Sequence, residues 1–414
     1  MNPHCRITGQ PRWLGRWLLP AVASLGLIAC QMPPQRDVAQ TAVPPAAAPA
    51  PIAFDNAVLK AANELLSRVP LPPTSGQRLA LLIDPLVDGV TGSQSLATRS
   101  MEQRIVDLVR RDYPQLEVQA FSSSNLAGQP LVLVGTFTPI NNAAGQPTGD
   151  RDAFRICLAL ADLKTGKVIS KGVARASPDG VKTTPLPFDA DSPAWTRDAA
   201  IDGYIRTCQG SKAGDPINPV YAARIMVAAL LNDAGNAYNG RRYHESLELY
   251  RRALNTAGGD QLRAHNGAYL AAWKLKRRDE ATLAFARLVD YGLANRQLAL
   301  KFLFRPGSTQ FIADAQISGP YPLWLNQIAR RSAQNRACLE IVGHTSRSGP
   351  EPINQRLSVL RAQAIKDRLD SAEPLLVKRT VASGVGSREN LVGTGSDDAG
   401  DALDRRVEFR VIDC

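Results

Sequence analysis

Residues 343–365, GHTSRSGPEPINQRLSVLRAQAI, decide how the C-terminal part of this chain folds. The preceding residues, CLEIV, alternate in polarity and include β-branched side chains, which predicts a strand that ends at Gly343. Pro352 suits the first turn of a helix that follows. Four residues of that helix recur at helical spacing and share one face: Asn354, Ser358, Arg361 and Ile365. Arg361 therefore points toward the small polar loop 344–346, an arrangement that favours an anionic ligand.

This stretch resembles the signature of the OmpA-like peptidoglycan-binding domain, and the resemblance extends over residues 298–414. The family pattern is G-H-T-D, a Gly three residues after the Asp, and then N-x-x-L-S-x-x-R-A. The residues that fall on this pattern are Gly343, His344, Thr345, Gly349, Asn354, Leu357, Ser358, Arg361 and Ala362. Two later segments, GVG at 384–386 and DRRVE at 404–408, match the family's G-x-G and N-R-R-V-E elements. The resemblance implies an α/β sandwich with the element order βαβαβ-β.

In the family this domain holds the diaminopimelate residue of the peptidoglycan stem peptide, with an Asp on its ammonium and an Arg on its carboxylate. Arg361 matches the family's Arg, but Ser346 stands at the position of the Asp, and Arg305 stands where an Asp is common. Because a charge-assisted hydrogen bond is about twice as strong as a neutral one, weaker binding is expected unless Glu351 substitutes. The resemblance implies a peptidoglycan site formed by Thr345, Ser346, Asn354, Leu357, Arg361 and Arg405. The alternative is an envelope assembly scaffold whose OmpA-like domain has lost peptidoglycan binding.

Residues 1–29 have the pattern of a bacterial lipoprotein signal peptide, with a positive start and a short apolar run at 18–29. The sequence LIAC at 27–30 resembles a lipobox, which implies that Cys30 is lipidated; the alternative is an ordinary secretory signal with a chance Cys. Gln31 after the Cys implies sorting to the outer membrane, facing the periplasm. Acyl chains, palmitate among them, are the expected anchor, because no other apolar run is long enough to span a bilayer.

The next two regions are a tether and a domain. Residues 30–53 are rich in Pro and Ala, which predicts a lipidated, extended tether. Residues 54–210 are predicted to form a periplasmic α/β domain with one helix that Asp55-Asn56 could cap and that extends to Val69, and a second helix over 100–113. Apolar and β-branched runs predict strands at 79–83, 116–121, 131–137, 155–163 and 167–176, the last two as a hairpin. The loop DPLVDG at 84–89 matches neither an EF-hand nor a P-loop, so we interpret it as a turn.

Residues 218–295 are predicted to be helical and repetitive. The pattern of Tyr238, Ser246 and Tyr250 returns 35 residues later as Trp273, Ala281 and Phe285. The segment resembles tetratricopeptide repeats, which implies a groove that recruits envelope proteins. A helical connector without a ligand is the alternative. Because two repeats are fewer than usually stand alone, we expect them to pack on their neighbours.

Four cysteines remain after the signal and the lipid site, and an even number suits disulfides in the oxidising periplasm. They are Cys157, Cys208, Cys338 and Cys414. Four cysteines allow three connectivities, and locality favours Cys157–Cys208 and Cys338–Cys414. If the strands before and at the C-terminus run antiparallel, Cys338 and Cys414 lie at the same end of one sheet.

Length, composition and charge limit the classes of function that this chain can have. The chain has 414 residues, 44% of them hydrophobic, and a formal charge of +11, which falls to +8 without the three Arg of the signal. The length predicts a multidomain protein, and the element patterns above place its parts in the α/β and α classes. The positive charge suits anionic wall polymers or lipid head groups. No catalytic, nucleic-acid-binding or metal-binding motif is present, so we expect no enzyme activity, no cofactor, no metal and no nucleic-acid partner. The sequence predicts an outer-membrane lipoprotein that tethers the membrane to peptidoglycan.

Overall fold

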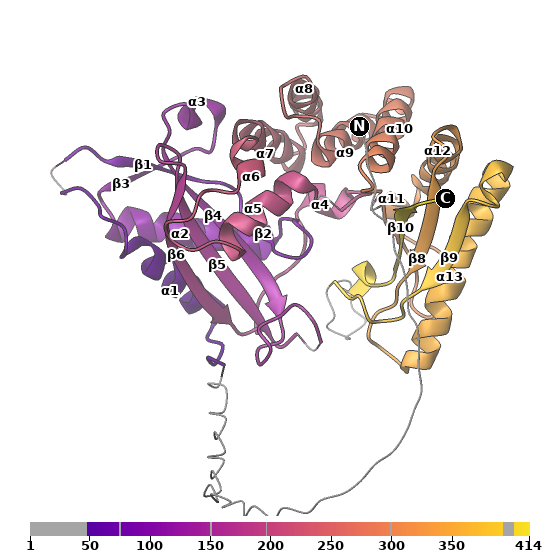
Figure 1. The fold of residues 1–414 in the computed structure, drawn as a ribbon, viewed down its shortest axis with the longest axis horizontal. Helices are drawn as coiled ribbons and strands as arrows, with labels where there is room; N and C mark the ends of the chain where they lie inside the picture. The colour runs from indigo at the N-terminus through magenta and orange to yellow at the C-terminus, as the bar shows by residue number, and fades with distance from the viewer. Residues whose placement is uncertain (1–47, 74–75, 150, 196, 299, 392–400) are drawn as a thin grey trace, which may run out of the picture. The chain divides into compact units, whose positions relative to one another are not determined.

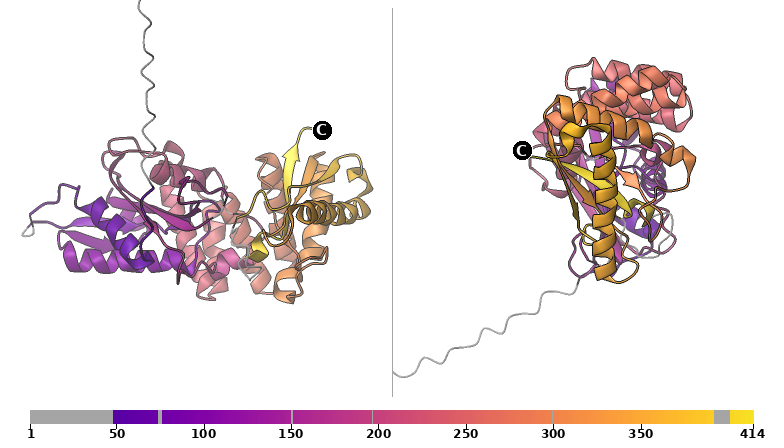
Figure 2. Two further views of the ribbon diagram at one scale, coloured as in Figure 1. Left: turned by 90° about the horizontal axis from the view of Figure 1, so that it is seen from below. Right: turned by 90° about the vertical axis from the view of Figure 1, so that its right-hand side faces the viewer.

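Two β-sheets and a row of helices make up the part of the chain that the computed structural model describes (Figures 1 and 2). It describes residues 48–73, 76–149, 151–195, 197–298, 300–391 and 401–414. Residues Ala47–Cys414 form one compact unit. The predicted signal peptide, the predicted lipid site at Cys30 and most of the predicted tether lie outside the described residues.

The first sheet has the strand order β3-β1-β4-β5-β6, with a short β2 that also pairs with β4. Its strands are β1 (Leu79–Ile83), β2 (Val87–Asp88), β3 (Leu116–Gln119), β4 (Leu131–Ile140), β5 (Ala153–Asp162) and β6 (Lys167–Ala176). β1 runs parallel to both β3 and β4, whereas β4, β5 and β6 are antiparallel. The predicted strands are all present. The structure also contains β2, a strand of two residues inside the predicted turn. Two residues are too few for an alternating pattern to be recognised in the sequence.

Both faces of this sheet are covered by helices, which explains the unbroken burial of β4. Leu133 on β4 joins the core beneath α1 (Phe54–Leu66) and α2 (Leu96–Asp112). Its neighbour Val132 joins the opposite core, which is closed by α5 (Ala199–Gln209) and α6 (Pro219–Ala222). Alternate side chains of one strand therefore enter different cores.

The α2 helix begins four residues before the predicted start because a capping box sits at Ser95. The Ser95 side chain accepts from the Thr98 backbone N–H, and Thr98 Oγ1 accepts from the Ser95 backbone N–H at 2.9 Å. Such a reciprocal pair satisfies donors that the first helical turn leaves without partners. Because Thr98 stands where the capping-box pattern has Glu or Gln, the sequence pattern did not reveal this cap.

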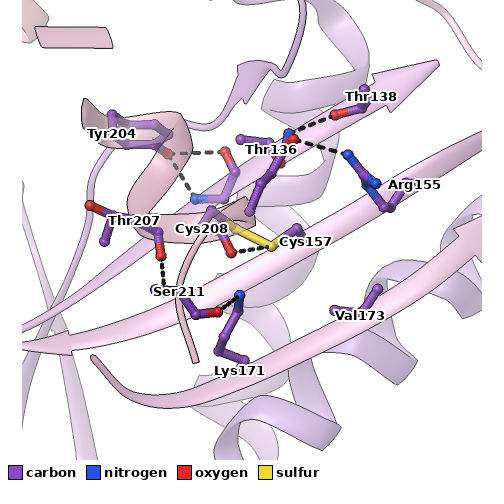
Figure 3. The surroundings of a disulfide bond; sticks show 12 residues. Thr136, Thr138, Arg155, Cys157, Lys171, Val173, Tyr204, Thr207, Cys208 and Ser211 are labelled. Carbon is purple, nitrogen blue, oxygen red and sulfur yellow. Dashed lines mark hydrogen bonds between the residues drawn. A yellow bond between two sulfur atoms is a disulfide. The ribbon is translucent and has the colours of Figure 1, made fainter. Parts of the chain in front are cut away.

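A disulfide joins the first sheet to the helix that covers it (Figure 3). Cys157 on β5 bonds to Cys208 on α5, with a Cα–Cα distance of 6.1 Å, and this is the pairing favoured by locality. On the same helix, the Tyr204 hydroxyl accepts from the Gly135 backbone N–H at 2.8 Å. Covalent and polar contacts thus fix α5 to the middle of the sheet.

Removing this disulfide by replacing Cys157 and Cys208 together with Ala is expected to lower the free energy of unfolding by about 3 kcal/mol, because a loop of this length restricts the unfolded chain. Urea unfolding of residues 47–414, wild type against the double variant, measures the difference. The second disulfide stays intact in both proteins and serves as the internal control. Equal unfolding midpoints and slopes would contradict the prediction.

Four helices follow the first sheet and pack side by side in chain order. They are α7 (Ile225–Asn239), α8 (Tyr243–Leu254), α9 (Leu262–Lys274) and α10 (Arg278–Ala294). Tyr250 on α8 is fully buried against α9 at Gly267, where a Cβ would lie 2.1 Å from its ring. The predicted repeat positions Ser246 and Ala281 are buried at the equivalent places in the two helix pairs. The identity of these pairs as tetratricopeptide repeats stays a prediction.

The second sheet has the strand order β7-β10-β8-β9. Its strands are β7 (Phe302–Leu303), β8 (Cys338–Gly343), β9 (Thr380–Gly384) and β10 (Arg406–Ile412). Two long helices, α12 (Tyr321–Gln334) and α13 (Glu351–Ala372), complete the order β-α-β-α-β-β that the resemblance implies. β8 and β10 run antiparallel with Cys338 opposite Ile412, and a disulfide joins Cys338 to Cys414 across that end.

One hydrophobic core extends from the four helices into the second sheet. The Trp324 ring on α12 stacks on Phe285 of α10 with ring centroids 5.6 Å apart. Its indole N–H donates to the Tyr269 hydroxyl of α9 at 2.6 Å. Through α9 and α10 the four helices therefore pack on α12, as expected for a segment that is too short to stand alone. Among the described residues, no helix is both long and apolar enough to cross a bilayer.

Candidate functional site

The candidate site lies where β8 ends and its loop meets α13. Gly343, the last residue of β8, lies so close to α13 that a Cβ there would be 1.8 Å from the Ser358 carbonyl oxygen. At Gly384, the end of β9, a Cβ would be 2.3 Å from the Ser358 hydroxyl oxygen. The Ser358 hydroxyl in turn accepts from the Gly386 backbone N–H at 3.0 Å. These glycines and Ser358 let the helix sit directly against the two strands and hold the loop above it.

Arg361 lies at the floor of this loop and is completely buried. Its guanidinium donates to three backbone carbonyls, those of Arg305 at 2.9 Å, Ser308 at 2.9 Å and His344 at 3.0 Å. The guanidinium carbon also lies 5.3 Å from the centroid of the Phe304 ring. Arg361 thus ties the loop after β7 to the loop after β8, and places a positive charge beneath both.

The polar side chains predicted above Arg361 are also buried. Thr345 and Ser346 expose 2% and 4% of their surfaces. The Ser346 hydroxyl lies 2.9 Å from that of Ser348, and Asn354 donates to the Ser348 carbonyl at 3.1 Å. Thr345 Oγ1 has no hydrogen-bond partner in the described part of the chain. A buried hydroxyl of this kind is a feature that a ligand polar group would satisfy.

The remaining two predicted residues lie at different distances from the loop. The Arg405 carbonyl accepts from the Phe304 backbone N–H at 2.9 Å, so Arg405 joins the same segment that Arg361 holds. Its side chain is 6% exposed. Leu357 is partly buried on α13, immediately before Ser358. The structure therefore gathers Thr345, Ser346, Asn354, Arg361 and Arg405 around the loop after β8, with Leu357 on the adjoining helix.

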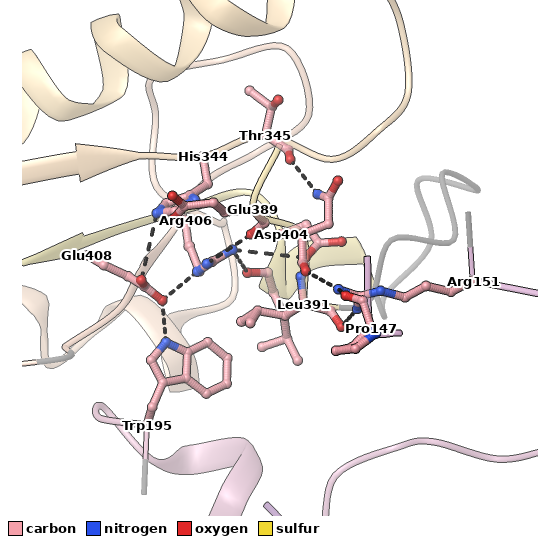
Figure 4. A network of polar contacts seen from close by, with 12 residues as sticks. Pro147, Arg151, Trp195, His344, Thr345, Glu389, Leu391, Asp404, Arg406 and Glu408 are labelled. Atoms are coloured by element: carbon pink, nitrogen blue, oxygen red, sulfur yellow. Dashed lines mark hydrogen bonds and ion pairs between the residues drawn. The ribbon is translucent and has the colours of Figure 1, made fainter. Parts of the chain in front are cut away.

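A buried network of charges lies beside the loop (Figure 4). Glu408 accepts from Arg406 Nε at 2.6 Å and from the Trp195 indole N–H, and it lies 3.7 Å from the His344 ring. Burial raises the pKa of Glu408, but Arg406 and His344 outweigh it and hold the pKa at about 2. Burial, reinforced by Arg406, lowers the pKa of His344 to about 3. His344 is therefore neutral at physiological pH and supports the loop without charge, consistent with a structural role.

Sequence reasoning missed the residues that reach this network from the first sheet and its loops. Arg151, which precedes β5, donates to the carbonyls of Asn390 and Leu391. The Asn390 side chain donates to the Thr345 carbonyl at 2.9 Å. Trp195 joins from the loop before α5. No sequence signal marks Arg151 or Trp195, because each contact joins residues about 200 or more positions apart.

The described residues contain no group of three or more His, Cys, Asp or Glu arranged to hold a metal ion. The donor set around the loop consists of hydroxyls, amides and guanidiniums, which suits hydrogen bonding to carboxylates and amides.

Comparison with solved structures finds proteins of the cell envelope over about a quarter of this chain. The peptidoglycan-associated lipoprotein from Burkholderia pseudomallei is 21% identical, with 27% of this chain and 89% of that chain covered and a TM-score of 0.24. The cell wall anchor of the T6SS from Pseudomonas aeruginosa is 27% identical, with 27% and 74% covered and a TM-score of 0.21. The C-terminal domain of Helicobacter pylori MotB is 18% identical, with 28% and 84% covered and a TM-score of 0.23. No protein-family model and no curated protein matches the chain.

The C-terminal part of the chain has the element order that its resemblance to the OmpA-like domain implies. Its strand order and its α12 and α13 helices follow the implied βαβαβ-β arrangement. The motif residues occupy the end of β8, the loop after it and the first turns of α13. The order of helices and strands and the positions of the motif residues therefore both agree with the resemblance.

Proposed function

We propose that the chain is an outer-membrane lipoprotein that tethers the membrane to peptidoglycan through a non-catalytic OmpA-like domain. The observation that carries this proposal is the position of Thr345 and Ser346 in the loop that the buried Arg361 holds, with Asn354 bonded to the same loop. Two proteins with similar structures are, by their names, a peptidoglycan-associated lipoprotein and a cell wall anchor. The proposed location is the outer membrane, with the domain facing the periplasm.

The proposed ligand is the diaminopimelate residue of the stem peptide, which carries an ammonium and a carboxylate. Arg361 supplies positive potential at the floor of the loop for the carboxylate, supported by Arg405. Thr345 Oγ1 and Ser346 Oγ offer neutral partners. The ammonium meets a hydroxyl instead of a carboxylate at Ser346, so the proposed interaction is weaker than one with an acid at that place.

Attachment and recruitment complete the proposal. Lipidation at Cys30 and an extended tether over residues 30–53 would let the folded unit stand away from the membrane and reach the wall. The helix pairs α7 to α10 would recruit envelope proteins. A groove of about 370 Å³ supports this role, with Leu247, Leu254 and the 55% exposed Leu283 in its lining. An amphipathic segment of a partner fits such a groove.

Replacing Ser346 with Asp is expected to strengthen retention on purified sacculi by about tenfold, because it exchanges a neutral acceptor for a charged one facing an ammonium. Co-sedimentation over a range of sacculus concentrations measures the effect. Ser371→Asp, an exposed position near the end of α13, adds the same charge away from the loop and is the matched control. If Ser346→Asp and Ser371→Asp behave alike while the wild type binds, the loop is not the ammonium site.

A second candidate function is an envelope assembly scaffold whose OmpA-like domain no longer binds peptidoglycan. The observation that favours it is the engagement of Arg361 with three backbone carbonyls, together with Ser346 at the position of the family's acid. Under this function, sacculi would retain neither the wild type nor Ser346→Asp.

A further inference from the structure

A cleft of about 690 Å³ lies beside the candidate peptidoglycan site, and no assignment above explains it. One wall comes from the loops of the first sheet and the segment before α5, and the other from the segment after β9 and from β10. The lining residues that matter for its chemistry are Arg151, Arg197, Arg347, Arg388, Asn390 and Arg406. Neither Ser346 nor Arg361 lines it, so the cleft is separate from the proposed diaminopimelate site.

The cleft concentrates positive charge. Among its described lining residues, five are Arg and two are Glu. Burial lowers the pKa of Arg151, Asp404 and Asp88 oppose this effect, and Arg347 and Arg406 lower the pKa further, so these arginines lie close enough to repel one another. Low-dielectric walls around like charges strengthen their field, and an anion that enters the cleft relieves the repulsion.

The arginines have two roles that differ in their contacts. Arg151 holds the walls together by donating to the Asn390 and Leu391 carbonyls across the cleft. Three others present their charges closer to solvent. The Arg388 side chain is 59% exposed and lies 3.6 Å from Glu351, and the Arg197 side chain is 42% exposed and lies 2.7 Å from Asp202. Arg347 reaches across the mouth to the Gly149 carbonyl at 3.1 Å.

We infer that this cleft binds a ligand bearing two or more carboxylate or phosphate groups, held by Arg347 and Arg388 on one wall and Arg197 on the other. Guanidinium groups bind such anions through paired hydrogen bonds, and arginines from two walls match a ligand with charges several ångströms apart. A carboxylate-rich stem peptide and a phosphate-bearing head group or polymer share this chemistry. Because Asn390 lines the cleft and bonds to Thr345, a bound anion would also stabilise the loop after β8.

Calorimetric titration of residues 47–414 with two probes tests the inference. The probes are the dipeptide L-Ala-D-Glu, which carries two carboxylates and no diaminopimelate, and inorganic pyrophosphate. At least one probe is expected to bind the wild type, more weakly as salt is raised. Arg347→Gln combined with Arg388→Gln is expected to weaken that binding by about tenfold or more, because two charge-assisted contacts are lost. Preference for the dipeptide indicates a wall ligand, and preference for pyrophosphate indicates a phosphorylated ligand.

Arg330→Gln, an exposed position on α12, removes a charge outside the cleft and is expected to leave binding unchanged. Thermal unfolding of each variant establishes that the fold is retained. Failure of both probes to bind, or equal binding by the double variant and the wild type, would overturn the inference. Retention on sacculi depends in our proposal on the Ser346 loop, so the two results fail independently.

Discussion

Replacing Arg361 with Ala is expected to lower the free energy of unfolding by about 3–5 kcal/mol, the usual cost of removing one member of a buried, hydrogen-bonded charge network. The side chain is fully buried and donates to three carbonyls on two loops, so its removal leaves these buried acceptors without their donors. Arg361→Lys is expected to lie between Ala and the wild type, because an ammonium keeps the charge without the planar fork.

Urea unfolding followed by tryptophan fluorescence measures this effect, since Trp324 lies in the core shared by α12 and the repeat helices. Arg356→Ala, an exposed position on the same helix, is the matched control and is expected to change stability little. A loss below about 1 kcal/mol for Arg361→Ala would contradict the structural role given to Arg361. This result also determines which variant can be used to test binding. If Arg361→Ala unfolds the domain, its loss of retention on sacculi would not show that Arg361 contacts the ligand.

Replacing Asp84 with Asn is expected to stabilise the protein increasingly as pH rises from about 4 to about 7. Burial raises the pKa of Asp84 from 3.8 to about 7, against the opposing effects of the Tyr221 hydroxyl and Arg263. When folding raises the pKa of a carboxyl group, the group contributes fully to the free energy of unfolding at pH values below its pKa in the unfolded chain. That contribution is lost as the pH rises through its pKa in the folded protein. With about 1.4 kcal/mol for each pKa unit, the stability gap should grow by about 4 kcal/mol across the window.

The substitution suits the site because Asn keeps the shape of Asp and an oxygen that accepts from the Tyr221 hydroxyl, now 2.6 Å from Asp84 Oδ2. Unfolding free energies of wild type and variant at intervals from pH 4 to pH 8 give the gap directly. Asp107→Asn, on the exposed side of α2, is the control. A gap that stays constant with pH would contradict the prediction, and one that shrinks as pH rises would reverse its sign.

The parts of the fold that the sequence predicted are those governed by local patterns. The strand before Gly343, the helix carrying Arg361 and the strands β1 and β3 to β6 follow from periodicity and residue type. The start of α2 was wrong by four residues because its cap uses Thr98 in place of Glu. The core shared by the repeat helices and the second sheet depends on contacts such as Phe285 with Trp324, which no local pattern contains.

The candidate site likewise has one part that the sequence predicted and one part that it did not. The motif placed Arg361 beneath the loop, and the structure has it there, bonded to the His344 carbonyl. Its other partners, the carbonyls of Arg305 and Ser308, are backbone groups more than 50 residues away and carry no sequence signature. The basic cleft was not predicted, because Arg151 and Arg197 reach it from a part of the chain with no recognised motif.

The most direct test of the proposed tether is co-sedimentation of wild-type residues 47–414 with purified sacculi, with and without an excess of soluble diaminopimelate-containing muropeptide. The account predicts that sacculi carry the protein into the pellet and that the muropeptide releases it. A pelleted fraction equal to that of the protein without sacculi would contradict the account and leave the scaffold as the better explanation.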